Sequence, residues 1–145
     1  MKTNANINLT MHIIQGFDRT KTAYTAKANF FEKDGKFYLF FEELNPDDGT
    51  LTKCRFEICA KMLRLRRNGQ VVIEQTHIHD EKTAGYLKTP FGHLDTKLKT
   101  FKFSFNRQTD GAYQLALGYD LYTGTEKTGT YLLEIIILPK EEIIS

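Results

Sequence analysis

The sequence predicts a single all-β domain in which one antiparallel sheet closes into a small up-and-down barrel of about 8–10 strands. Three observations lead to this fold class. Hydrophobic and polar residues alternate along most of the chain, as they do in strands that place one face on a core. Asp-Gly and Asn-Gly pairs, which favour tight turns, separate the alternating runs, and one long run changes its alternation midway.

The alternation has a period of two residues, which is the period of a β-strand. In one late run, Leu115, Leu117 and Tyr119 are apolar while the residues between them are small or polar. Each such run is expected to turn its apolar side chains toward a shared interior. The clearest runs are residues 7–13, 24–30, 53–58, 70–74 and 114–121.

Turn residues stand between these runs. Asp34-Gly35 and Asn68-Gly69 are strong signals for tight hairpins, because both residues tolerate the left-handed conformation that such turns require. Residues 45–49, Asn-Pro-Asp-Asp-Gly, predict a longer turn. Asp110-Gly111 and Gly124 mark two later connections. No helical period competes with this succession of short runs and turns.

Two irregularities favour a barrel over a sandwich. Leu98 is apolar at an even position, whereas Phe101, Phe103 and Phe105 are apolar at odd positions, so the strand must contain a bulge or a corner. Gly118 interrupts another strand, and glycine in a strand often marks a bend. Strands that bend midway allow a single sheet to curl and close.

Composition bounds the class of protein. The 145 residues suit one domain, taken as residues 1–145, and 41% hydrophobic with 26% charged residues is ordinary for a globular chain. The N-terminus has no apolar signal region, and the longest apolar stretch, residues 131–138, contains Glu134. Cys54 and Cys59 are five positions apart, so their side chains are expected on opposite faces and unpaired. We expect a cytoplasmic protein with no membrane partner.

Several segments, in order along the chain, carry a family resemblance. They are the strand 37–43 that ends in paired glutamates, the Arg67-Asn68-Gly69 turn, Tyr86 followed by Thr89-Pro90-Phe91-Gly92, and Tyr119-Asp120-Leu121. With these segments the chain resembles the YwiB-like family of small bacterial proteins of uncharacterised function.

The resemblance runs from about Phe30 to about Ile137, and the first twenty-odd residues show no clear match. It implies a calycin-like, or lipocalin-like, β-barrel. It implies no activity, because the family has no established one. Barrels of this type often hold a small ligand, which is an analogy at the level of the fold only.

Two charged residues continue rows of apolar, core-directed side chains. Arg67 follows Leu63 and Leu65 on one strand face, and Glu43 follows Phe41. Since an isolated buried ion is very costly, each must be paired or lie near the barrel mouth. The functional interpretation is an Arg and a Glu that orient a polar group of a ligand. The alternative is a structural ion pair or a solvated strand end.

The segment from Tyr86 to Phe91 is a second candidate for ligand contact. Pro90 cannot donate a ladder hydrogen bond, so a ligand could reach a rim interrupted there and meet Tyr86, Thr89 and Phe91. An edge or bend with a satisfied tyrosine is the alternative. We also expect Tyr119 to contribute to the ligand site, because it lies in a core-directed row.

Other patterns give weaker signals. His77 and His79 share a strand parity beside Asp80 and could bind a metal, but exposed histidines without a ligand explain them better. We expect no metal, no cofactor and no catalytic residues, since the chain has no phosphate-binding loop and no nucleophile elbow. The net charge of +2 is small, so we do not expect a nucleic-acid partner. Basic residues do gather in two places, at Lys61, Arg64, Arg66 and Arg67 and at Lys97, Lys99 and Lys102.

Three classes of function remain, in this order. The first is a non-catalytic barrel that binds a small, partly apolar molecule in its lumen near Glu43, Arg67 and Tyr86. The second is a solid barrel that acts through its outer surface as a protein- or nucleic-acid-interaction module. The third is an enzyme, which would need convergent titratable groups in the lumen. The sequence leaves the oligomeric state open, a homodimer included.

Overall fold

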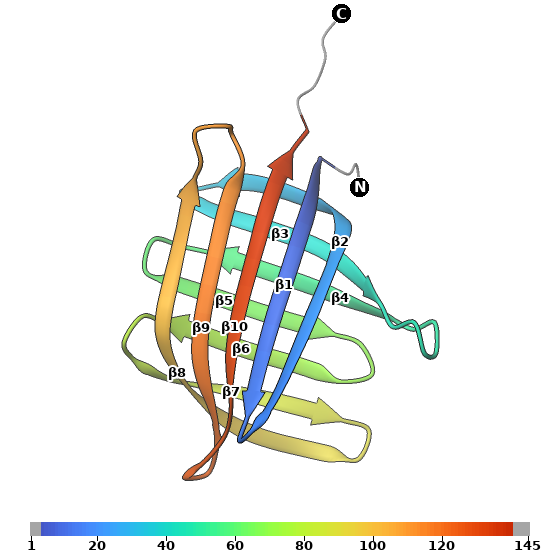
Figure 1. The fold of residues 1–145 in the computed structure, drawn as a ribbon, viewed down its shortest axis with the longest axis vertical. Helices are drawn as coiled ribbons and strands as arrows, with labels where there is room; N and C mark the ends of the chain where they lie inside the picture. The colour runs from blue at the N-terminus through green and yellow to red at the C-terminus, as the bar shows by residue number, and fades with distance from the viewer. Residues whose placement is uncertain (1–3, 141–145) are drawn as a thin grey trace, which may run out of the picture.

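The computed structural model describes residues 4–140, and ten β-strands make up most of that range (Figure 1). The strands alternate with short connections along the whole described chain. Their bounds are β1 (Ala5–Gln15), β2 (Asp18–Lys33), β3 (Lys36–Leu44), β4 (Leu51–Ile58), β5 (Met62–Asn68), β6 (Val72–Ile78), β7 (Lys82–Thr89), β8 (Gly92–Arg107), β9 (Tyr113–Thr123) and β10 (Glu126–Pro139).

Each strand pairs antiparallel with its neighbours in sequence, and β1 pairs with both β2 and β10. The sheet is therefore one closed up-and-down barrel of ten strands. The fold class predicted from the alternating sequence is confirmed. Within residues 4–140 there is no helix, and hence none of the length and apolarity needed to cross a bilayer.

The barrel is flattened into two layers that cross each other (Figure 1). In this view the later part of β8, then β9, β10, β1 and the first part of β2, run upright in front, and β3 to β7 cross behind them with the first part of β8. The two longest strands, β2 and β8, have 16 residues each and pair with strands of both layers. Bending of these two strands joins the layers.

The change of parity in β8 is a β-bulge, as the sequence predicts. The pairing of β8 with β9 shifts register between Thr100 and Lys102. Before the shift, Leu98 and Thr100 are fully buried, and after it Phe103 and Phe105 pack against the core. The extra residue, Phe101, is turned outward and is 41% exposed.

Each predicted turn lies between two strands, but one of them differs in type from the tight hairpin that was expected. Asp34 and Gly35 join β2 to β3 with φ values of 56° and 77°, the left-handed conformation expected of a tight hairpin. Residues 45–49 join β3 to β4, and Gly49 has a φ of 73°. The tight two-residue hairpin expected at Asn68-Gly69 is wrong. Asn68 still pairs with Val72, neither Asn68 nor Gly69 has a positive φ, and the three residues 69–71 join β5 to β6.

One end of the lumen is filled by aromatic rings. Phe30, Phe37, Phe105 and Tyr113 contact one another with ring centroids 4.9–6.4 Å apart. Such pairs contribute about 0.5–1.5 kcal/mol each beyond the area they bury. We call this group the aromatic plug. It lies at the end of the barrel that carries the β8–β9 connection, next to the buried start of β1.

Two strand glycines allow close approach of neighbouring groups, and they differ in what a larger residue would meet. A Cβ at Gly85 would lie 2.6 Å from the carbonyl oxygen of Glu74 on β6, which is backbone. A Cβ at Gly118 would lie 2.7 Å from the far edge of the Phe101 ring, which is partly exposed. The ring has room to move, whereas the ladder carbonyl does not.

We therefore expect Gly85→Ala to lower the free energy of unfolding by about 1–3 kcal/mol, the usual cost of overpacking. Gly118→Ala is the matched control. Its cost should be smaller, because rotation of the partly exposed Phe101 ring relieves the contact. Urea unfolding of both variants measures the difference. Equal losses in the two variants would show that the backbone contact at Gly85 is not the cause.

Candidate ligand-binding site

The other half of the lumen is not filled. A cavity of about 250 Å³ lies in the lumen, and each of the ten strands contributes at least one residue to its wall. Its wall is mostly apolar, and it includes Leu9, Met11, Phe41, Phe56, Leu65 and Leu133. The cavity extends toward the end of the barrel opposite the aromatic plug, where Ile13 and Thr22 approach the β1–β2 turn.

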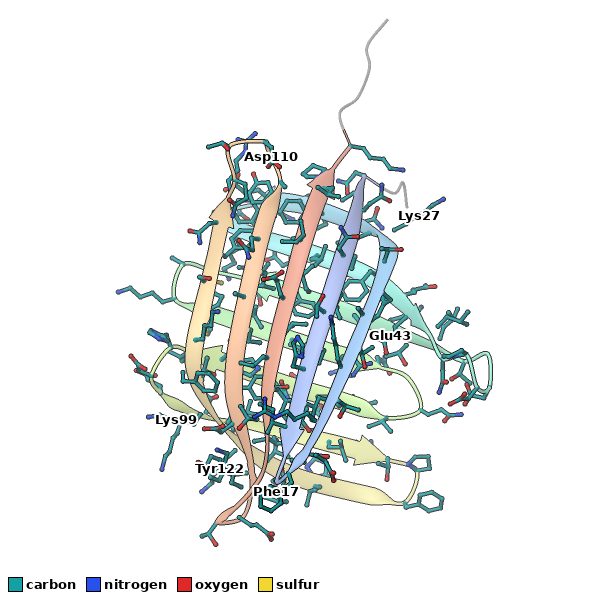
Figure 2. The ribbon with its side chains drawn as sticks, viewed as in Figure 1. Phe17, Lys27, Glu43, Lys99, Asp110 and Tyr122 are labelled. Atoms are coloured by element: carbon teal, nitrogen blue, oxygen red, sulfur yellow. The ribbon has the colours of Figure 1, made fainter. Side chains whose placement is uncertain are left out.

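A charged pair and a tyrosine stand in this wall. Arg67 Nη2 donates to Glu43 Oε1 at 2.6 Å, and the Tyr24 hydroxyl donates to Glu43 Oε2 at 2.6 Å. The Arg67 and Glu43 side chains are 34% and 32% exposed, so the pair keeps contact with solvent. Glu43 lies near the end of β3, where the chain leaves the barrel for the β3–β4 connection (Figure 2).

The local environment keeps these groups in defined protonation states. Burial and the hydrogen bond to Glu43 raise the pKa of Tyr24, so its phenol stays protonated and donates. Burial is the largest single effect on Arg67 and works against its charge, but Glu43 together with Cys54 and Tyr24 outweighs it, so the pKa of Arg67 is raised. At neutral pH the cavity wall therefore carries one cation hydrogen-bonded to one anion.

The family described as Domain of unknown function (DUF1934) matches residues 7–135. The chain belongs to the DUF1934 family. The crystal structure of ywiB protein from Bacillus subtilis is similar, with a TM-score of 0.81 and 18% identity over 96% of this chain and 93% of that one. This match confirms the expected resemblance to YwiB-like proteins at the level of the fold. No curated protein matches the chain significantly.

A second polar group in this DUF1934 barrel lies deeper, behind the cavity. His77 is fully buried, and its Nδ1 and Nε2 lie 2.8 Å from Thr100 Oγ1 and 2.9 Å from Gln75 Oε1. Gln75 and Tyr119 both line the cavity. Burial raises the pKa of Tyr119. These contacts satisfy polar groups that would otherwise be costly in the interior.

The structure brings together three of the residues predicted for the ligand site. Glu43, Arg67 and Tyr119 all line the cavity. Tyr86 borders it, but the Tyr86 hydroxyl donates to Glu74 Oε2 at 2.6 Å, next to Arg66. Since Arg66 and Glu74 face outward, the Tyr86 ring reaches the outer surface rather than the lumen.

Thr89 and Phe91 do not line the cavity. They belong to the β7–β8 turn, in which the Thr89 hydroxyl accepts a hydrogen bond from the Phe91 backbone amide at 3.1 Å. The Phe91 side chain is 99% exposed. Pro90 thus lies in a hairpin turn, between Thr89 and Phe91, that does not line the cavity.

The expectation that both histidines are exposed is wrong for His77. His79 is half-exposed, and its Nε2 lies 3.1 Å from the carbonyl oxygen of Phe101. The two side chains thus share a parity but not an environment. Within residues 4–140, no three His, Cys, Asp or Glu side chains are grouped closely enough to hold a metal ion.

The cysteines are unpaired, as their spacing predicts. Cys54 lines the cavity beside Arg67 and is buried, and burial raises the pKa of its thiol to about 11. It is therefore protonated at neutral pH and acts as a small apolar wall residue. Cys59 lies directly after β4 and is partly exposed.

Sequence reasoning missed Tyr24, Gln75 and Tyr131 as cavity residues. Tyr24 had a usable signal, because it sits in an apolar row of an alternating strand and carries a hydroxyl. Gln75 had a similar signal, as a polar residue two positions from Ile73. Neither signal says which polar partner stands across the lumen.

The buried His77 predicts a pH dependence of stability. Burial lowers the pKa of His77 from 6.5 to about 4, so between these values the unfolded chain binds more protons than the folded chain. Stability is therefore full above pH 6.5 and falls as the pH falls toward about 4. The slope should reach about 1.4 kcal/mol per pH unit.

His77→Gln cannot titrate and serves as the control. Its unfolding free energy should be lower than that of the wild type near neutral pH, because it loses the contacts to Thr100 and Gln75. The difference in unfolding free energy between the wild type and His77→Gln should then become smaller as the pH falls. Urea unfolding across this range measures it, and parallel pH profiles would rule out His77 as the titrating group.

Proposed function

We propose that this DUF1934 barrel binds a small, partly apolar molecule in its lumen and catalyses no reaction on it. The observation that carries the proposal is the cavity of about 250 Å³ beside a hydrogen-bonded Arg–Glu pair. An engineered apolar cavity of about 150 Å³ is large enough for benzene, and drug-sized ligands occupy about 300–1,000 Å³. The size supports a ligand with about one or two rings, or a short aliphatic chain.

The chemistry of the wall supports the same proposal. Ligand sites are mostly apolar and contain a few polar groups that fix the orientation of the ligand. Here Leu65 and Leu133 represent the apolar wall, and Arg67, Glu43 and Tyr24 supply the polar groups. Because Arg67 and Glu43 remain one-third exposed, they are accessible to a molecule that enters.

The titratable groups support a binding role over a catalytic one. The Cys54 thiol is a poor nucleophile, with a pKa of about 11. Both nitrogens of His77 are hydrogen-bonded within the core, and its pKa of about 4 makes it a weak base. A solid barrel acting only through its outer surface fits less well, because the lumen contains a cavity of about 250 Å³.

A bulky residue at the cavity wall should abolish binding. Ile13 lines the cavity, whereas the next residue, Ile14, does not and points to the opposite face of β1. We expect Ile13→Trp to weaken the binding of 2-naphthalenemethanol, a neutral two-ring probe, at least tenfold. Ile14→Trp should stay within about twofold of the wild type. Isothermal titration calorimetry measures the three affinities, and thermal unfolding confirms that the variants are folded.

Native mass spectrometry of freshly purified protein provides an independent test. A co-purified small molecule that is present in the wild type and in Ile14→Trp, but missing from Ile13→Trp, would support a lumen ligand. If the probe binds none of the proteins and no molecule co-purifies, the proposed function fails.

A further inference from the structure

The charges that face the cavity cancel each other. Arg67 and Glu43 are the only side chains in its wall, among the described residues, that are charged at neutral pH. The remaining polar wall groups are hydroxyls, an amide and the protonated Cys54 thiol. A ligand with a net charge would therefore leave one charge uncompensated in a largely apolar cavity, which is costly.

The two members of the pair differ in how many of their hydrogen-bonding groups are still unused. Both carboxylate oxygens of Glu43 are already engaged, Oε1 by Arg67 and Oε2 by Tyr24. A guanidinium has five N–H donors, and only Nη2 of Arg67 is used by Glu43. With the Arg67 side chain 34% exposed, N–H donors remain for a molecule in the cavity.

Resting on the proposed function, we infer that the ligand is an uncharged molecule with an apolar body and a carbonyl-type acceptor, such as an amide, ketone or ester. Its carbonyl oxygen accepts a hydrogen bond from Arg67, and its body lies against the apolar wall around Leu65 and Leu133. Arg67 meanwhile keeps its bond to Glu43, so no charge loses its partner.

Ligands of either charge fit less well. A carboxylate would compete with Glu43 for Arg67 and would add a second anion beside it, in a place where like charges repel. An ammonium would lie beside the Arg67 cation, where like charges repel, and would compete with Arg67 and Tyr24 for the Glu43 oxygens. The neutral acceptor is the class that uses the free donors without breaking the existing pair.

Three probes that share one apolar body test this inference: 2-naphthamide, 2-naphthoate and 2-naphthylmethylamine in its ammonium form. Calorimetric titration of the wild type at neutral pH should show the amide binding at least tenfold more tightly than either charged probe. Equal or tighter binding of the naphthoate or the ammonium probe would overturn the inference. This comparison needs no variant.

Two substitutions probe the cause of the preference. Glu43→Gln leaves the Arg67 charge unpaired, so the naphthoate should gain at least tenfold relative to the amide. Arg67→Met removes the donor, so the amide should lose about tenfold. Glu74→Gln, which removes the carboxylate that Arg66 contacts on the outer face, is the matched control and should leave the order unchanged. If folded Glu43→Gln binds the probes in the same order of affinity as the wild type, the inference is wrong.

The two proposals fail in different ways. If 2-naphthalenemethanol binds and is blocked by Ile13→Trp, while the three matched probes bind equally or not at all, the lumen is a binding site but its ligand class is different. If neither the alcohol nor any of the three probes binds and no molecule co-purifies, the proposed function fails and this inference fails with it.

Discussion

Closure of the sheet depends on two strands that belong to both layers of the barrel. β2 and β8 each run for 16 residues, and each pairs with a strand of the front layer and a strand of the back layer (Figure 1). A bent strand must keep its apolar side chains inside on both sides of the bend. In β8 the bulge at Phe101 does this, since the extra residue lets Leu98 and Phe105 both face the lumen despite their different parity.

The interior that results is divided into two parts with different packing. At one end the rings of Phe30, Phe37, Phe105 and Tyr113 fill the lumen. Toward the other end the inward residues include Leu9, Leu65 and the long polar side chains of Arg67 and Glu43, which leave open space between them. Arg67 and Glu43 are tolerated there because they are paired and partly solvated, whereas the fully buried His77 needs polar partners on both ring nitrogens.

The residues predicted for a ligand site line the cavity where the prediction followed strand periodicity, and most of those predicted from a turn lie away from it. Glu43 and Arg67 were found because each continues an apolar row at the end of a strand, and such a row has only one possible face. Tyr86, Thr89 and Phe91 were placed near the ligand because of Pro90. A proline shows that the ladder is interrupted, but not whether the interruption lies beside the lumen or at an exposed hairpin tip.

The sequence by itself determined the strands, their inward faces, the turns at Asp34-Gly35 and residues 45–49, and the bulge in β8, because these depend on contacts between residues close together in the chain. Only the tertiary structure decided that Tyr24 and Arg67 share Glu43, and that His77 is buried while His79 is not. It also decided which half of the lumen stays open. Those outcomes depend on which residues meet across the barrel, and that is set by strand tilt and closure rather than by local pattern.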